Sequence, residues 1–329
     1  MEIFKKVFSI FLRIIITAAL LIYLFAQVDK KAMFEIISRS NKWLLLASFC
    51  VYFLIYVACL LRWGQLLGAV KIRLPLKRIT ISYAGSVFFN LFLPSTIGGD
   101  LMRSIDLASH TKRTKEVIAT VLLDRLSGYI GLVLLSLFSL LLGWRLIQDK
   151  SVLISVVIIT SVLIGVLLVL FNSFLYSRIS KLLDSPNAGR IRQLIKDLHD
   201  EIHLFKNNKT VIVKSLLISV FIQSLPPLSF YLIALSLGIK INIIYFFIFI
   251  PIIGAITLLP ISIGGLGLRD ATTIYFFAKV GVVKNLAFAM SLLNFFFILI
   301  CGAIGGIIYV LTVHHRRIQH HPSSPVHPS

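Results

Sequence analysis

The sequence predicts an all-α integral membrane protein, with six transmembrane helices and two re-entrant hairpins arranged as an inverted 3+3 repeat. Composition, the spacing of apolar segments and an internal repeat carry this prediction. Hydrophobic residues make up 58% of the 329 residues and charged residues only 14%, and the mean hydropathy is +0.94. A water-soluble domain of this size does not need so much apolar surface, whereas a bundle of lipid-facing helices does.

Eight apolar segments follow one another along the chain, most of them close to the roughly 20 residues that a helix needs to cross a bilayer. They lie at about 7–28, 43–61, 79–94, 117–143, 152–171, 211–237, 243–260 and 285–312. The first segment follows two lysines and resembles a signal peptide. It is long, however, and no convincing small-residue cleavage site follows it, so we interpret it as an uncleaved first span.

The net charge is +20. Its distribution along the chain fits the topology of a membrane protein rather than a nucleic-acid-binding surface. If all eight segments crossed from a cytoplasmic N-terminus, the basic connection 172–210 would lie outside, against the positive-inside rule. The segments 79–94 and 243–260 each end in a Leu-Pro pair followed by a Gly-Gly pair, which stops a helix. If these two segments enter and return on the same side, roughly twice as many Lys and Arg residues lie inside as outside, and both termini are cytoplasmic.

An internal repeat supports the same topology. Residues 93–103 read LPSTIGGDLMR and residues 259–269 read LPISIGGLGLR, so both copies contain P-x3-GG-x3-R. Pro, Gly and Arg are scarce enough in this chain that a chance second copy is rare. Each copy follows two spans and precedes one, so three spans per unit place the second unit upside down, as in secondary transporters.

Polar residues around the two breaks are the candidate site. A break at membrane depth survives only in a protein interior or beside a watery cavity, so we expect the two breaks to meet inside the bundle. Buried charges there imply a ligand or mutual pairing, and the alternative is that they are ion pairs that only hold the hairpins, with Asp106 among them. For Asp124 and Arg125 the alternative is an interfacial pair. The predicted lipid-headgroup residues are Asn90, Pro94, Gly98, Gly99, Asp100, Arg103, Asp124, Arg125, Pro260, Gly264, Gly265, Arg269 and Asp270.

Within this set, Arg103 and Arg269 are the predicted phosphate contacts. We expect Asp100, Asp124 and Asp270 to pair with these arginines or with a cationic group. No catalytic residues, metal site or cofactor are predicted, since the sequence contains no nucleotide-binding or hydrolase motif.

The domain organisation follows from these segments. We expect one transmembrane domain over 1–313, with repeat units of about 1–145 and 146–313. A cytoplasmic amphipathic helix is predicted at about 190–206, where apolar residues share one helical face, and a disordered cytoplasmic tail at 314–329.

Three sequence runs carry a family resemblance: NLFLPSTIGGDLMR, DRLSGYIGL at 124–132, and LLPISIGGLGLRD. Together they resemble the transmembrane region of lysylphosphatidylglycerol synthases, a flippase-like family found alone or fused to an aminoacyl-transfer domain. The resemblance spans nearly the whole chain. The second motif ends in Arg269-Asp270 where the family pattern suggests Arg-Glu, which keeps the carboxylate. The polar stretch 172–210 is too short for the transferase domain, so lysyl transfer is not expected.

The expected function is therefore movement of a lipid with a charged headgroup between leaflets, by a non-enzymatic transporter. Its expected partners are a phospholipid or other charged lipid and the membrane, and not nucleic acid. Its expected location is a bacterial or archaeal cytoplasmic membrane. Two alternatives remain open, namely a membrane partner or enzyme in carrier-lipid or glycolipid envelope synthesis, and a noncatalytic scaffold.

Overall fold

The computed structural model describes residues 30–92, 97–143, 209–257 and 265–319, together with Arg145, Ser262 and parts of 153–165. All regular structure in this part of the chain is helical. The helices are α2 (Lys30–Arg39), α3 (Lys42–Ala69), α4 (Leu76–Phe89), α5 (Ile97–Thr111), α6 (Thr114–Gly143), α10 (Lys209–Ser236), α11 (Ile243–Thr257), α12 (Leu268–Ala278) and α13 (Lys284–Gln319). The expected first span 7–28 and the amphipathic helix 190–206 lie outside the described residues, as does most of the span 152–171.

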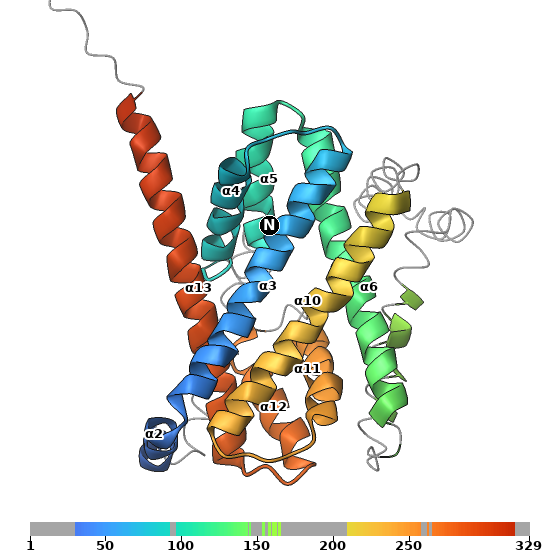
Figure 1. Cartoon of the computed structure of the whole chain (residues 1–329), viewed down its shortest axis with the longest axis vertical. Helices are drawn as coiled ribbons and strands as arrows, with labels where there is room; N and C mark the ends of the chain where they lie inside the picture. The colour runs from blue at the N-terminus through green and yellow to red at the C-terminus, as the bar shows by residue number, and fades with distance from the viewer. Residues whose placement is uncertain are drawn as a thin grey trace, which may run out of the picture.

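Four of these helices, α3, α6, α10 and α13, are long and apolar enough to cross a membrane. They match the expected spans 43–61, 117–143, 211–237 and 285–312 and confirm an all-helical membrane architecture. In Figure 1, α3 and α10 run side by side through the middle of the bundle, with α13 along one edge and α6 along the other.

The α13 helix continues to Gln319, so the first six residues of the expected disordered tail are helical instead. The physical reason is local, because the sequence contains no proline or glycine between Gly306 and Pro322 that would end the helix.

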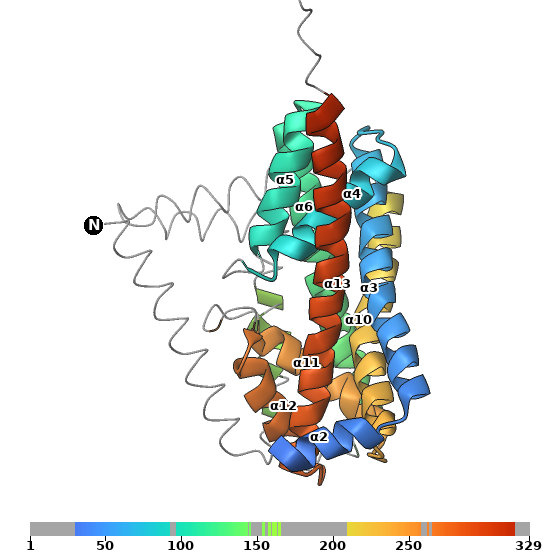
Figure 2. The ribbon, with the colours of Figure 1, turned by 90° about the vertical axis from the view of Figure 1, so that its left-hand side faces the viewer.

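Two pairs of shorter helices contain the repeated motifs. The first pair is α4 and α5, which pack against each other, and the second is α11 and α12. Figures 1 and 2 agree that the first pair lies at one end of the long axis of the bundle and the second pair at the other. The chain therefore interrupts a helix at both copies of the motif, and the two interruptions belong to opposite halves of the molecule.

Glycines let α13 approach α4 closely. An added Cβ at Gly305 would lie 2.7 Å from the Ala84 carbonyl oxygen, and one at Gly85 would lie 2.5 Å from the Tyr309 ring. Close backbone approach through small residues is the usual way that helices associate in a bilayer, where no hydrophobic effect drives them together. This packing fixes the first hairpin against the last span.

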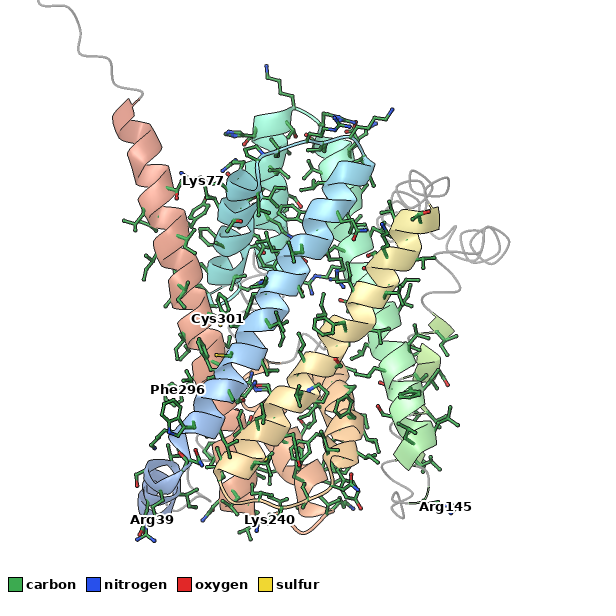
Figure 3. The ribbon with its side chains drawn as sticks, viewed as in Figure 1. Arg39, Lys77, Arg145, Lys240, Phe296 and Cys301 are labelled. Atoms are coloured by element: carbon green, nitrogen blue, oxygen red, sulfur yellow. The ribbon has the colours of Figure 1, made fainter. Side chains whose placement is uncertain are left out.

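Apolar side chains cover the outside of the bundle and also fill both halves. One buried cluster surrounds Phe246, Phe249 and Phe277 in the half that contains α11 and α12. A second cluster surrounds Trp63 and Leu107 in the half that contains α4 and α5. Figure 3 shows Phe296 pointing outward from the side of α13, whereas Arg39, Arg145 and Lys240 gather at one end. This distribution suits a protein that is surrounded by lipid between two polar ends.

Candidate functional site

The centre of the first half contains a charged cluster that begins with Arg62 on α3. Its side chain lies within an apolar span, where insertion of an arginine costs about 2.5–3.5 kcal/mol. The guanidinium Nε donates to Asp124 Oδ1 at 2.7 Å, and Nη1 donates to Ser219 Oγ of α10 at 2.7 Å. Arg62 is 5% exposed and Asp124 is also 5% exposed. This bridge joins three long helices through one buried charge.

Arg103 on α5 shares the same carboxylate. Its Nη2 lies 2.9 Å from Asp124 Oδ2 and 3.0 Å from Asp100 Oδ1. The guanidinium also stacks over the Trp63 ring, with 4.7 Å from Cζ to the ring centroid, and lies near Tyr83. Its Nε and Nη1 are buried and have no hydrogen-bond partner. Arg103 is thus held by two carboxylates and an aromatic face while part of its donor capacity is unused.

Asp100 stands in the first turn of α5, where the positive end of the helix dipole favours a carboxylate. Its second oxygen, Oδ2, pairs with Arg125 Nε of α6. In the same turn, the Gly99 amide donates to Asn90 Oδ1 at 3.0 Å, which ties α5 to the end of α4. An added Cβ at Gly99 would lie 2.2 Å from the Ser86 carbonyl oxygen, so this position requires glycine.

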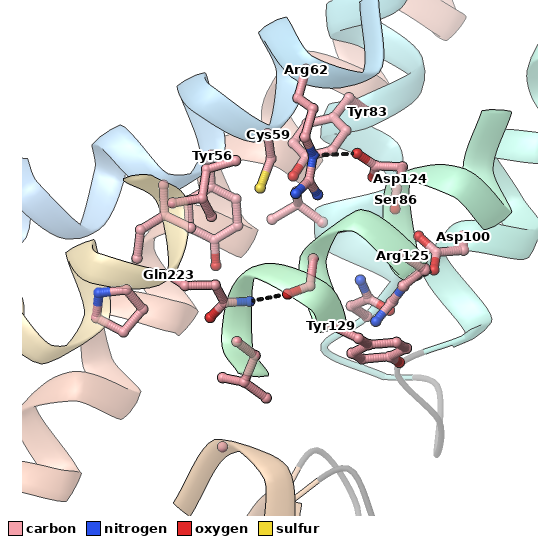
Figure 4. Close-up of a pocket in the computed structure, with 18 of the residues that line it drawn as sticks. Tyr56, Cys59, Arg62, Tyr83, Ser86, Asp100, Asp124, Arg125, Tyr129 and Gln223 are labelled. Atoms are coloured by element: carbon pink, nitrogen blue, oxygen red, sulfur yellow. Dashed lines mark hydrogen bonds and ion pairs between the residues drawn. The ribbon is translucent and has the colours of Figure 1, made fainter. Parts of the chain in front are cut away.

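A cavity of about 350 Å³ lies beside this cluster. Side chains from both halves line it, including Tyr56 and Arg62 of α3, Arg103 of α5, Arg125 of α6 and Gln223 of α10. Figure 4 shows Arg62, Asp124, Asp100 and Arg125 grouped along one side of the cavity, with Tyr56 and Gln223 opposite. Gln223 Nε2 donates to the Gly128 carbonyl at 3.0 Å, which ties α10 to α6 at the wall.

The charges of this cluster do not cancel. It contains three guanidinium groups, on Arg62, Arg103 and Arg125, and two carboxylates, on Asp100 and Asp124. Among the described residues, one positive charge is in excess at a place where hydration is restricted. An anionic group that entered the cavity would therefore meet both net positive potential and unused guanidinium donors.

The structure thus brings Asn90, Gly99, Asp100, Arg103, Asp124 and Arg125 together, with Gly98 adjoining them in α5. Asp124 is buried between α3 and α5, where it pairs with Arg62 and Arg103. Asp106 lies apart from the cavity and pairs with Arg78 of α4 at 2.7 Å, so that pair holds the hairpin. Pro94 lies outside the described residues.

The second motif, at residues 259–269, differs from the first in the partners of its arginine. Arg269, in the first turn of α12, is 9% exposed, and its Nε and Nη2 have no partner. Within the described residues no ion pair joins Asp270 to Arg269; Asp270 Oδ2 accepts from the Gly267 amide at 3.0 Å and Oδ1 accepts from Ser291 Oγ. Gly265 has φ +75° and Gly267 has φ +76°, values that favour glycine where the chain turns into α12. Pro260 and Gly264 lie outside the described residues.

Two cluster members escaped the sequence reasoning. Arg62 follows the predicted span 43–61 directly and was assigned to the cytoplasmic connection, whereas α3 continues to Ala69 and buries it. The available signal was the apolar run Trp63-Gly64-Gln65-Leu66-Leu67, which lengthens the helix beyond Arg62. Ser219 carries no such signal, since a lone serine in an apolar span is common.

Comparison with known proteins places this geometry in a family. The sequence profile of the lysylphosphatidylglycerol synthase TM region matches residues 10–306. The chain belongs to that family.

Two relatives within the lysylphosphatidylglycerol synthase TM-region family are UPF0104 membrane proteins of archaea. One, PH1989 from Pyrococcus horikoshii, is 23% identical over 307 residues, which cover 86% of this chain and 91% of the relative. The other, from Methanothermobacter thermautotrophicus, is 24% identical over 281 residues, covering 78% of this chain and 79% of the relative.

Family membership confirms the resemblance based on the two motifs, and it agrees with the helical architecture of an integral membrane protein. The match covers both halves of the bundle, so the charged cluster and the second motif both lie within the part that defines the family.

Proposed function

We propose that this protein moves a lipid with a charged headgroup between the two leaflets of the membrane. The headgroup passes through the cavity at the centre of the bundle, while the acyl chains remain in lipid. The observation that carries this proposal is the cavity of about 350 Å³ beside a buried cluster with one excess positive charge. A purely structural cluster would gain more from complete neutralisation, since every uncompensated buried charge costs free energy.

Such a cavity lowers the energy barrier to transfer of the headgroup across the membrane. A headgroup crosses pure hydrocarbon slowly because its charges lose their hydration. Guanidinium, tyrosine and amide groups on the cavity wall replace part of that hydration. In this scheme Arg103 and Arg125 contact the phosphate, whereas Asp100 and Asp124 hold the guanidinium groups in position and offer carboxylates to a cationic headgroup.

The two hairpins supply the route in this proposal. Both are re-entrant, open to opposite sides of a bacterial or archaeal cytoplasmic membrane, and belong to inverted repeat units, with both chain termini in the cytoplasm. The placement of α4–α5 and α11–α12 at opposite ends of the bundle supports this arrangement (Figures 1 and 2). In this proposal the headgroup contacts residues of both motifs, among them Asn90, Asp100, Arg103 and Arg125 of the first and Arg269 and Asp270 of the second.

Reconstitution into liposomes tests the proposal. Vesicles carry a headgroup-labelled anionic, zwitterionic or aminoacylated lipid, and dithionite reports how fast each lipid leaves the protected inner leaflet. We expect ATP-independent exchange faster than in protein-free vesicles for at least one lipid class. Substitution of Arg125 by Gln should slow this exchange, because it removes a cavity-facing cation whose side chain is 30% exposed and which pairs with Asp100.

Protein-free rates for every lipid, both with and without an imposed proton gradient, would contradict the transport proposal. They would favour a partner or enzyme in carrier-lipid or glycolipid synthesis, or a noncatalytic scaffold. Co-purified lipid, identified by mass spectrometry, then distinguishes a lipid-binding partner from a scaffold that retains none.

A further inference from the structure

Three polar groups near the second break are buried without a partner. They are the guanidinium of Arg269, whose Nε and Nη2 make no hydrogen bond, the amide Nδ2 of Asn294 and the hydroxyl of Ser262. Their residues are 9%, 4% and 5% exposed, respectively. Buried polar groups are almost always hydrogen-bonded, because an unmade bond leaves the cost of desolvation uncompensated. All three groups can donate a hydrogen bond.

Contacts between α12 and α13 place Arg269 and Asn294 in the same region. Ser291 of α13 donates to Asp270, and the Phe295 ring lies under the Arg269 guanidinium, 5.5 Å from Cζ to the ring centroid. Asn294 is three residues after Ser291 and next to Phe295, so it shares the face of α13 that meets α12. The cation–π contact with Phe295 offsets only part of the cost of burying the charge.

No carboxylate compensates Arg269 within the described residues. The carboxylate of the adjacent Asp270 instead accepts from the Gly267 amide and from Ser291, which caps α12 and anchors it to α13. Arg103, the equivalent arginine of the first motif, instead has two carboxylates at about 3 Å, Asp100 and Asp124. The two copies of one sequence motif thus differ in charge balance: the first contains paired arginines, and the second contains an uncompensated cation at the positive end of a helix.

We infer that Arg269 and Asn294 form a second binding site, separate from the cavity, that takes a phosphate group. A phosphate oxyanion suits this site, since it supplies negative charge and accepts bonds from both the guanidinium and the amide donors. Resting on the proposed transport function, this inference makes the phosphate that of an anionic phospholipid. A zwitterionic lipid would bring its own cation into a site that has no free carboxylate.

A row of tyrosines connects the two sites. Tyr56 lines the cavity, and the Tyr52 ring meets it edge-on, with 5.8 Å between ring centroids. Tyr52 in turn interacts electrostatically with Arg269. Figure 4 shows Tyr56 on the side of the cavity opposite Asp100 and Arg125. In this proposal an anionic headgroup therefore passes Tyr56 and Tyr52 on its way to Arg269.

Direct binding measurements test the site without requiring transport. The full chain, purified in detergent, is titrated calorimetrically with short-chain phosphatidylglycerol, short-chain phosphatidylcholine and inorganic phosphate. We expect phosphatidylglycerol to bind and to displace inorganic phosphate, and phosphatidylcholine to bind at least about tenfold more weakly. Arg269→Gln should lower the affinity for phosphatidylglycerol about tenfold or more, and Asn294→Leu should lower it several-fold. Lys284→Gln removes an equal charge from the exposed start of α13 and should leave binding unchanged.

Two results would overturn the inference. One is equal affinity for phosphatidylglycerol in wild-type protein and in Arg269→Gln protein of unchanged melting temperature. The other is binding of inorganic phosphate that the lipid does not displace, which would assign the site to free phosphate. Failure of the transport proposal is a separate outcome: binding that depends on Arg269 but is accompanied by no lipid exchange in liposomes leaves the second site in place and removes its role in a path.

Discussion

Arg103 Nη2 and Asp124 Oδ2 lie 2.9 Å apart, and this contact joins the first hairpin to the long helix α6 at the centre of the bundle. Asp124 also binds Arg62, and Arg103 also binds Asp100, so the pair is the middle link of a five-residue chain that ends at Arg125. Each carboxylate in this chain serves two arginines. Removal of a carboxylate therefore leaves more uncompensated charge than removal of an arginine.

Stability measurements on Asp124→Asn and Arg103→Gln test whether loss of a carboxylate destabilises the protein more than loss of an arginine. Asp124→Asn removes the carboxylate that Arg62 and Arg103 share. It should lower the free energy of unfolding by about 3–5 kcal/mol. Arg103→Gln should cost less, because Asp100 keeps Arg125 and Asp124 keeps Arg62. Thermal unfolding in detergent compares the two variants. The control is Arg39→Gln in an exposed pair with Glu35, expected to cost about 1 kcal/mol or less. A smaller loss for Asp124→Asn than for Arg103→Gln would contradict the shared-carboxylate arrangement.

Arg269→Gln should affect the melting temperature differently from substitutions in the first charged cluster. It removes a buried cation that no described carboxylate compensates, so we expect the melting temperature of the ligand-free protein to stay the same or rise. Lipid exchange in liposomes should nevertheless fall. A loss of melting temperature comparable to that of Asp124→Asn would show that Arg269 has a purely structural role.

Glycine contacts between α13 and α4 should be sensitive to one added methyl group. Gly305→Ala places a Cβ 2.7 Å from the Ala84 carbonyl oxygen and should cost about 1–3 kcal/mol, because the two backbones must separate. Gly254→Ala in α11 is the matched control, since no atom lies within 4 Å of its added Cβ. Thermal unfolding of both variants is the measurement. Equal stability of the two variants would mean that the α4–α13 contact is looser than described.

Labelling of single cysteines tests whether the hairpins open to opposite sides. Cys50, Cys59 and Cys301 are first replaced, and single cysteines are introduced at Ser109, near the end of α5, or at Val283, before α13. Both positions are exposed. An impermeant maleimide should reach Ser109→Cys only from the cytoplasm and Val283→Cys only from outside. Reaction of both from the same side would refute the inverted arrangement.

Sequence periodicity and composition identified the long helices well, because a span of roughly 20 apolar residues has few alternatives to a transmembrane helix. The residues of the first motif were also found from the sequence alone, since Pro, Gly and charged residues stand out in an apolar chain. Arg62 was missed because hydropathy ends a predicted span at a charge, whereas the folded helix continues when that charge finds Asp124 and Ser219.

The sequence by itself determined the membrane class, the family and the two interrupted helices, since each depends on local composition or on a short motif. The tertiary structure decided which charges neutralise each other. Two copies of the same motif give a paired Arg103 and, among the described residues, an uncompensated Arg269, because α3 and α6 bring Arg62, Asp124 and Arg125 to the first copy, whereas α13 brings Ser291 and Phe295 to the second. Charge compensation is a property of neighbours from distant parts of the chain, and those neighbours meet only when the helices pack.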